Sequence, residues 1–120
     1  MEVKDVKNVK PSELGIGKVS YDDIFNGKID RHVPMVLPQK GILKAIQEIC
    51  VNEGNDTFIA VTPDKILKRL KKTSISPFMP DKGNIHLDID LMINRGWLRK
   101  TDNQIILTDH AKEQLLKIKN

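Results

Sequence analysis

Residues 96–108 have the sequence GWLRKTDNQIILT, and this stretch decides the expected fold. Two β-prone runs, Trp97 to Lys100 and Ile105 to Leu107, flank residues 101–104, which are typical of a turn. Two such runs around a short polar turn predict a β-hairpin.

A helix is expected on each side of this hairpin. Gly96 ends the first, roughly Lys82 to Arg95, because glycine enters left-handed geometry without a steric penalty. Thr108 offers a side-chain oxygen to the first amides of the second, from Asp109 to about Ile118. Within the helix before the hairpin, helical spacing puts three residues on the buried side: Ile85, Ile89 and Met92.

Further upstream, a longer helix is expected from about Gln39 to Asn52. Its apolar residues recur at helical spacing: Ile42, Ala45, Ile46, Ile49 and Cys50. Lys44, Gln47 and Glu48 stand between them and predict the polar side of an amphipathic helix. Cys50 lies on the apolar side and is therefore expected to be a packed residue.

The chain between these helices supplies one more. Residues 57–61 are a short β-prone run, and Thr62-Pro63-Asp64 is a strong helix start. We expect that helix to run from about Pro63 to Lys72. Residues 73–82 contain two prolines, which forbid a continuous helix, so a loop is expected there.

The first third of the chain is predicted to be irregular because glycine and proline interrupt it. One short helix is expected from Ser20, as the N-cap, to Asn26. Residues 33–37 favour a short strand or an extended arm. Two interpretations remain open for residues 1–36: a tail that packs along the domain, or an arm that dimerises or contacts DNA.

From Pro38 onward, the order is helix, short strand, helix, loop, helix, hairpin, helix. Two local motifs accompany this order: Gly96-Trp97-Leu98 follows the third helix, and Leu107-Thr108 is followed three residues later by Ala111. The order and these motifs together resemble winged helix-turn-helix regulators such as the MarR and PadR families. The resemblance covers residues 38–118. It implies an α+β, mainly α fold, with a three-helix core, a β-hairpin wing and a C-terminal helix. We therefore expect residues 1–36 to form an irregular N-terminal extension and residues 37–120 to form the winged-helix domain.

The resemblance also implies that the helix from Lys82 to Arg95 lies in the major groove of duplex DNA. Its outward side departs from a usual base-reading face, because it carries His86, Asp90 and two leucines. Leu87 and Leu91 are four residues apart, a spacing typical of a partner-binding ridge. They could instead pack under the preceding loop.

Positive charge favours a polyanionic partner. The net charge is +4 and the pI about 9.2, and all of the excess falls in residues 37–120, where 14 Lys and Arg face 10 Asp and Glu. The predicted nucleic-acid contacts are Lys65, Lys68, Arg69, Lys71, Lys72, Asn84, His86, Arg95, Arg99 and Lys100.

Two functions follow. The first is a DNA-binding protein, a small transcriptional regulator or replication accessory factor that binds duplex DNA as a dimer. The alternative is a protein-interaction module that uses the same scaffold, in which Leu87 and Leu91 anchor a protein partner or a second copy of the chain.

Other classes find no support in the sequence. No catalytic, metal-ligating or nucleotide-binding motif is present, so neither an enzyme nor a cofactor is expected. No run approaches the roughly 18 apolar residues of a membrane span, and the first residues lack the apolar core of a signal peptide. With a single cysteine, a cytoplasmic location is the simplest expectation.

Overall fold

The computed structural model describes residues 8–26, 37–72 and 82–118, with the side chains of residues 25, 37, 38 and 82–84 left out. Nine elements follow in order: η1 (Pro11–Glu13), η2 (Gly15–Lys18), α1 (Tyr21–Phe25), α2 (Leu37–Glu53), α3 (Pro63–Lys72), α4 (Lys82–Asn94), β1 (Leu98–Thr101), β2 (Gln104–Leu107) and α5 (Asp109–Leu116). The described chain is therefore mainly helical with one antiparallel hairpin, which confirms the α+β, mainly α class.

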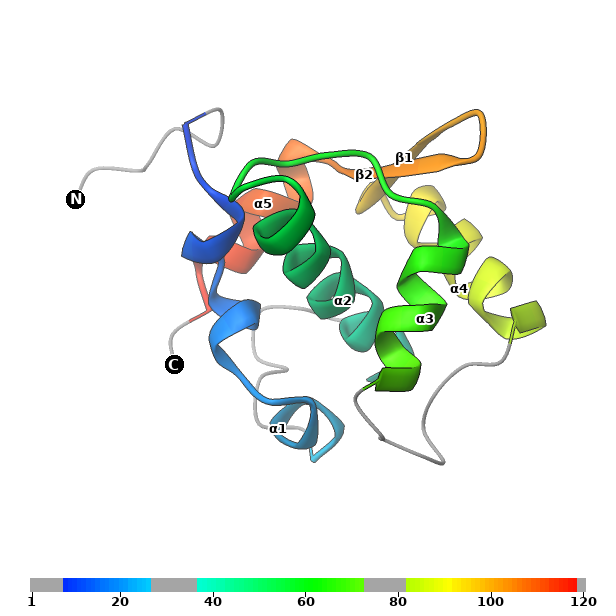
Figure 1. Cartoon of the computed structure of the whole chain (residues 1–120), viewed down its shortest axis with the longest axis horizontal. Coiled ribbons are helices and arrows are strands. Elements are labelled where there is room, and N and C mark those ends of the chain that lie inside the picture. Colours follow the sequence, from blue (N-terminus) through cyan, green and yellow to red (C-terminus); the bar gives the residue numbers. More distant parts are fainter. Residues whose placement is uncertain (1–7, 27–36, 73–81, 119–120) are drawn as a thin grey trace.

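Helix α2 lies in the middle of the molecule (Figure 1). The short helices η1, η2 and α1 contact α2 from one side, and α3 and α4 pack against it as well. The position follows from its sequence, since α2 carries apolar residues on more than one face. Ile42, Leu43 and Ile46 are all fully buried.

A single core joins the N-terminal segment to the rest of the chain. Leu14, Ile16 and Ile24 are fully buried in the same cluster as residues of every helix from α2 to α5. Residues 8–26 thus pack along the domain, which is one of the two interpretations left open by the sequence. Cys50 is buried as expected, and burial raises the pKa of its thiol.

The hairpin is fixed to the start of α3 by one additional strand contact. β1 pairs with β2 in the register Leu98 to Leu107 and Thr101 to Gln104. Val61 forms an isolated antiparallel bridge to Ile105, in which the two amide nitrogens lie 2.8 and 2.7 Å from the carbonyl oxygens that accept from them. Of the β-prone run 57–61, only Val61 takes part in strand pairing.

The predicted helix ends are confirmed by their hydrogen bonds. Ser20 Oγ accepts from the Asp23 amide at 3.1 Å, and Thr108 Oγ1 accepts from the Ala111 amide at 3.2 Å. Thr62 Oγ1 accepts from the Lys65 amide at 3.3 Å. Gly96 has φ 81°, the left-handed geometry expected after α4.

Two expectations are wrong. Leu37 begins α2, so it is helical rather than part of a strand or extended arm; residues 33–36 lie outside the described chain. The predicted polar side of α2 is also largely buried: Lys44 is 4% exposed and Gln47 1%. The reason is that the N-terminal segment covers that side of the helix. The loop expected at residues 73–82 falls outside the description, except for Lys82, which begins α4.

Candidate nucleic-acid interface

The predicted contact residues do not form one surface, because most of them fall on two separate grooves. The first, the wing groove, has a volume of about 310 Å³ and is lined by Thr62, Pro63, Asp64, His86, Lys100 and Asn103. The second, the α2–α3 groove, has a volume of about 150 Å³ and is lined by Ile49, Asn52, Glu53, Lys65, Lys68, Arg69 and Lys72. No described residue lines both grooves.

The wing groove forms where α3 begins, where α4 passes and where the hairpin turns. The bridge from Val61 to Ile105 holds the hairpin beside Thr62, the next residue in the chain. Lys100 lies opposite Ile105 in the hairpin register and is exposed, while Ile105 is fully buried. His86 is exposed on α4. This groove brings the Lys100 amine and the His86 imidazole together with the carboxylate of Asp64.

The remaining predicted contacts lie apart from both grooves. Arg99, Lys71 and Arg95 are exposed, and none of them lines either groove. Arg99 belongs to β1, so it extends the positive charge of the hairpin beside Lys100. The side chain of Asn84 lies outside the description.

The buried and exposed sides of helix α4 carry the residues that the sequence predicts for each. Ile85, Ile89 and Met92 are buried, as predicted. Leu87 is 60% exposed and Leu91 40%, which makes them the exposed large hydrophobic residues of the described chain.

The acidic residues of α4 differ in their surroundings. Asp90 is exposed, whereas Asp88 is partly buried. Burial raises the pKa of the Asp88 carboxyl, and a hydrogen bond from the Gln39 side chain opposes that shift. Among the outward side chains from His86 to Leu91, only the imidazole can donate a hydrogen bond to a base edge.

In the α2–α3 groove, two of the four cations already have acidic partners. Lys65 Nζ lies 2.8 Å from Glu53 Oε1, and about half of each side chain is exposed. Arg69 Nε lies 3.0 Å from Glu48 Oε1. Lys68 and Lys72 are exposed and form no ion pair with any residue in the described part of the chain.

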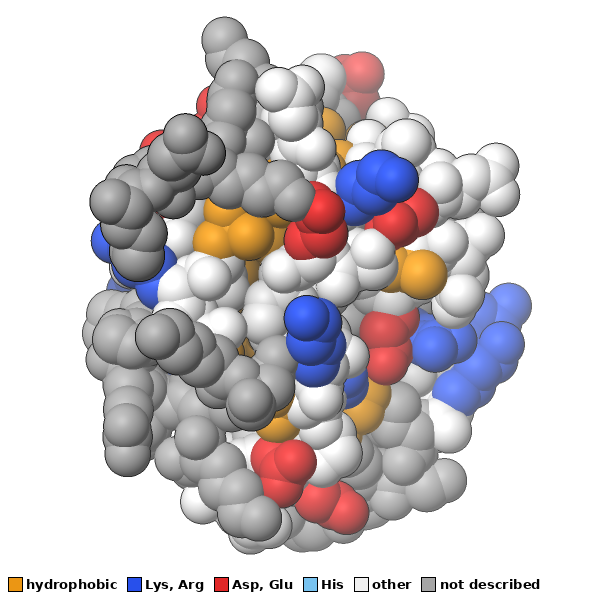
Figure 2. Space-filling view, turned by 90° about the vertical axis from the view of Figure 1, so that its left-hand side faces the viewer, with side chains coloured by type: hydrophobic (Ala, Val, Ile, Leu, Met, Phe, Trp, Pro, Cys, Tyr) orange, Lys and Arg blue, Asp and Glu red, His pale blue; other side chains and the backbone are white. Residues whose placement is uncertain are grey.

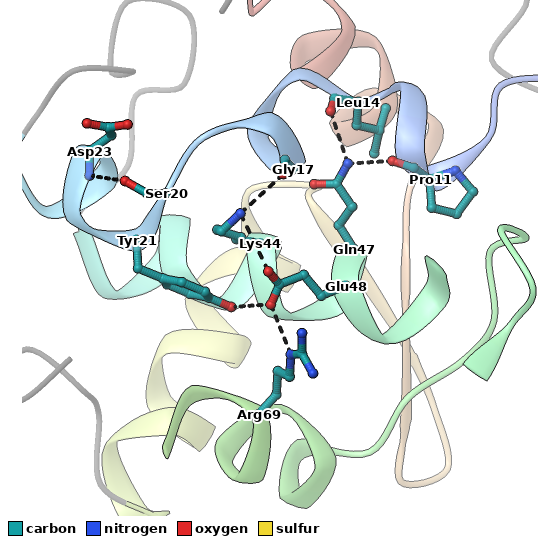
Figure 3. A network of polar contacts seen from close by, with 10 residues as sticks. All are labelled: Pro11, Leu14, Gly17, Ser20, Tyr21, Asp23, Lys44, Gln47, Glu48 and Arg69. Atoms are coloured by element: carbon teal, nitrogen blue, oxygen red, sulfur yellow. Dashed lines mark hydrogen bonds and ion pairs between the residues drawn. The ribbon is translucent and has the colours of Figure 1, made fainter. Parts of the chain in front are cut away.

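Arg69 belongs to a polar network that the sequence did not reveal (Figure 3). The Glu48 carboxylate accepts from Arg69 Nε at 3.0 Å and from the Tyr21 hydroxyl at 2.9 Å, and Lys44 Nζ lies 3.6 Å from it. Lys44 also donates to the Gly17 carbonyl at 3.3 Å. One carboxylate therefore joins α1, α2 and α3, and Arg69 has a structural role.

A second anchor lies one residue before Glu48. The Gln47 amide donates to the carbonyl oxygens of Leu14, at 3.0 Å, and of Pro11 (Figure 3). These contacts explain why Gln47 is buried, and the bond from Lys44 to the Gly17 carbonyl explains the burial of Lys44. The signal that could have found the Gln47 contacts is Gly17, since a side chain there would overlap the Gln47 amide.

Burial and charge shift two pKa values in this network. Burial, reinforced by Glu48, raises the pKa of Tyr21 far above its ordinary value of 10.0. Burial lowers the pKa of Lys44, and the nearby Glu48 carboxylate limits that shift. The network thus favours a neutral Tyr21, whose hydroxyl donates to the Glu48 carboxylate.

The described residues on the face that carries the N-terminal segment include charges of both signs. Figure 2 shows acidic and basic side chains interspersed there, with hydrophobic side chains visible only in small separate areas. Among the residues that the structure describes, no group of three or more His, Cys, Asp or Glu is placed to hold a metal ion. No described helix is long and apolar enough to cross a membrane.

Comparisons of the chain with protein-family models, with characterised proteins and with solved structures find no match.

Proposed function

We propose that this chain is a winged-helix protein that binds duplex DNA, as a small transcriptional regulator or a replication accessory factor. The observation that carries the proposal is the bridge between Val61 and Ile105. This one-residue bridge ties the hairpin to the chain directly before α3. The helix order, together with a hairpin held in this position, is the arrangement expected of a winged helix-turn-helix domain.

The wing groove is the proposed contact with the duplex. Lys100 and His86 line it, and Arg99, which lines neither groove, adds a second positive charge to the same hairpin on β1. Cations in this position bind phosphate groups and release the counterions that surround DNA. Helix α4, which borders the groove, is the proposed element that enters the major groove.

Phosphate contacts dominate in this proposal, because α4 offers few groups that read bases. Among the outward side chains from His86 to Leu91, only His86 can donate a hydrogen bond to a base, and the exposed Asp90 carboxylate repels phosphate. Contacts to phosphate position a protein without reading sequence. We therefore expect little difference in affinity between unrelated duplexes.

The experiment that tests this proposal compares two variants of equal charge. Arg99→Gln/Lys100→Gln removes two positive charges from the wing, and Lys117→Glu changes the net charge by the same amount at an exposed site outside both grooves. Salt-dependent fluorescence anisotropy should give the wing variant a log–log slope that is smaller by about 1.8, or about 0.9 for each lost phosphate contact. Equal slopes for the wing variant, the control and the wild type would refute the proposed contact surface.

A second function is favoured by one observation, the exposure of Leu87 and Leu91. In this alternative, the two leucines anchor a protein partner or a second copy of the chain. Light scattering of Leu87→Ser/Leu91→Ser distinguishes the two functions. Loss of an assembly together with unchanged DNA affinity supports an interaction role for this face, whereas loss of DNA affinity alone assigns the face to DNA.

A further inference from the structure

The α2–α3 groove carries a stripe of positive charge that the wing groove does not use. Its cations, Lys65, Lys68, Arg69 and Lys72, recur at the three- and four-residue spacing that puts side chains on one side of a helix. With a rise of 1.5 Å per residue, the stripe extends over about 10 Å of α3. Because Lys68 and Lys72 have no acidic partner among the described residues, the stripe keeps a net positive charge.

This groove opens on a different side of α3 from the wing groove. Residues of α2 form its other wall, namely Ile49, Asn52 and Glu53. The wing groove instead meets α3 only at Pro63 and Asp64, and its other walls come from α4 and the hairpin. The two grooves are therefore separated by α3 itself.

The lining of the α2–α3 groove indicates the chemistry of its partner. Among the described residues, Ile49 is the only apolar one that lines the groove, and it is 4% exposed, so the described lining offers no pocket for the apolar anchors that stabilise protein interfaces. No aromatic side chain in the described part of the chain lines the groove, so that part offers no surface on which unpaired bases could stack. A row of cations without either feature fits a densely charged phosphate backbone, such as that of duplex DNA.

We propose that the α2–α3 groove binds the backbone of a second DNA duplex, so that one molecule holds two duplex segments at once. The inference rests on the proposed function of the wing groove, which supplies the first duplex. Lys68 and Lys72 make the principal contacts with the second backbone. Lys65 and Arg69 add positive potential, although Glu53 and Glu48 offset part of it.

A capture experiment tests this bridging directly. The full chain is loaded onto a bead-bound duplex of random sequence at low salt and washed, and a second, fluorescent duplex is then added. The groove variant is Lys68→Gln/Lys72→Gln, and its charge-matched control is Lys117→Glu. We expect the wild type and the control to capture the second duplex and the groove variant to lose that capture. Both variants should bind the first duplex equally well.

Each other outcome overturns a stated part of the account. If the wild type binds the first duplex but captures no second one, bridging is refuted and the proposed function stands. If it binds no duplex at all, both are refuted.

If the groove variant still bridges, the second duplex is held elsewhere, for example by a second copy of the chain. If the groove variant binds the first duplex less well than Lys117→Glu does, both grooves belong to one footprint. If a poly-glutamate peptide shifts the NMR signals of Lys68 and Lys72 while duplex DNA does not, the groove serves an acidic protein segment.

Discussion

Substitution of Glu48 should destabilise the protein far more than substitution of a neighbouring, equally charged residue. Glu48→Gln keeps the shape of the side chain but removes the charge that Tyr21, Lys44 and Arg69 share. A hydrogen bond to a charged group contributes about 1.5–3 kcal/mol, against about 0.5–1.5 kcal/mol for a neutral one. Two such bonds are weakened, and Lys44, whose side chain is 6% exposed, loses its anion.

We therefore expect Glu48→Gln to lower the free energy of unfolding by about 2–3 kcal/mol. The matched control is Glu53→Gln in the same helix. Its ion pair with Lys65 is about half exposed on both sides, so its loss should cost no more than about 0.5 kcal/mol. Urea unfolding followed by the fluorescence of Trp97, the single tryptophan, measures both variants at an unchanged m value. Equal losses for the two variants would refute the structural role of Glu48.

Three further predictions test other parts of the structure. The pKa of Tyr21 is raised in the folded state, so its contribution to stability is complete below its ordinary pKa of 10.0 and is lost as pH rises above that value. In urea titrations between about pH 9 and about pH 11, the wild type should therefore lose more stability than Tyr21→Phe. Parallel losses for the two proteins would contradict this. Gly15→Ala would place a methyl group against the backbone of Ile118, so thermal unfolding should show a loss of about 1–3 kcal/mol, whereas an unchanged Tm would mean that the two segments do not pack closely. Leu87→Ser/Leu91→Ser should change the free energy of unfolding by no more than about 0.5 kcal/mol because both residues are exposed; a cooperative loss of several kcal/mol would show that these leucines belong to the core.

The elements with strong local signals could be predicted from the sequence. Pro63–Lys72 has the predicted bounds, since Thr62-Pro63-Asp64 specifies a helix start and the apolar spacing specifies its buried side. The ends of α4 and α5 differ by only one or two residues from those expected. Local patterns are reliable here because caps and turns act within a few residues.

The N-terminal contacts could not be predicted, because they depend on residues far apart in the chain. Gln47 and Pro11 are 36 residues apart, and Glu48 and Tyr21 are 27 apart. Helical periodicity assigns Lys44 and Gln47 to solvent unless another segment is known to cover them. The same limit affects the candidate site, since the ion pair between Arg69 and Glu48, 21 residues apart, could not be predicted from local patterns.

The division of the basic residues into two grooves was equally hidden. Lys65, Lys68 and Lys72 face α2, whereas Lys100 faces the start of α3. The sequence shows how many cations a helix carries, but the packing of α3 against α2 and α4 decides which side of the molecule each group faces. Substitutions therefore need to be chosen by groove rather than by their order along α3.

The most direct test of the central claim is the affinity of the wild-type chain for a duplex of random sequence as salt rises, measured by fluorescence anisotropy. The account predicts binding at low salt that weakens linearly on a log–log plot, with a slope of about −0.9 for every phosphate contacted. It also predicts nearly the same curve for a second, unrelated duplex. No binding at low salt and micromolar protein would contradict the claim that this chain binds duplex DNA.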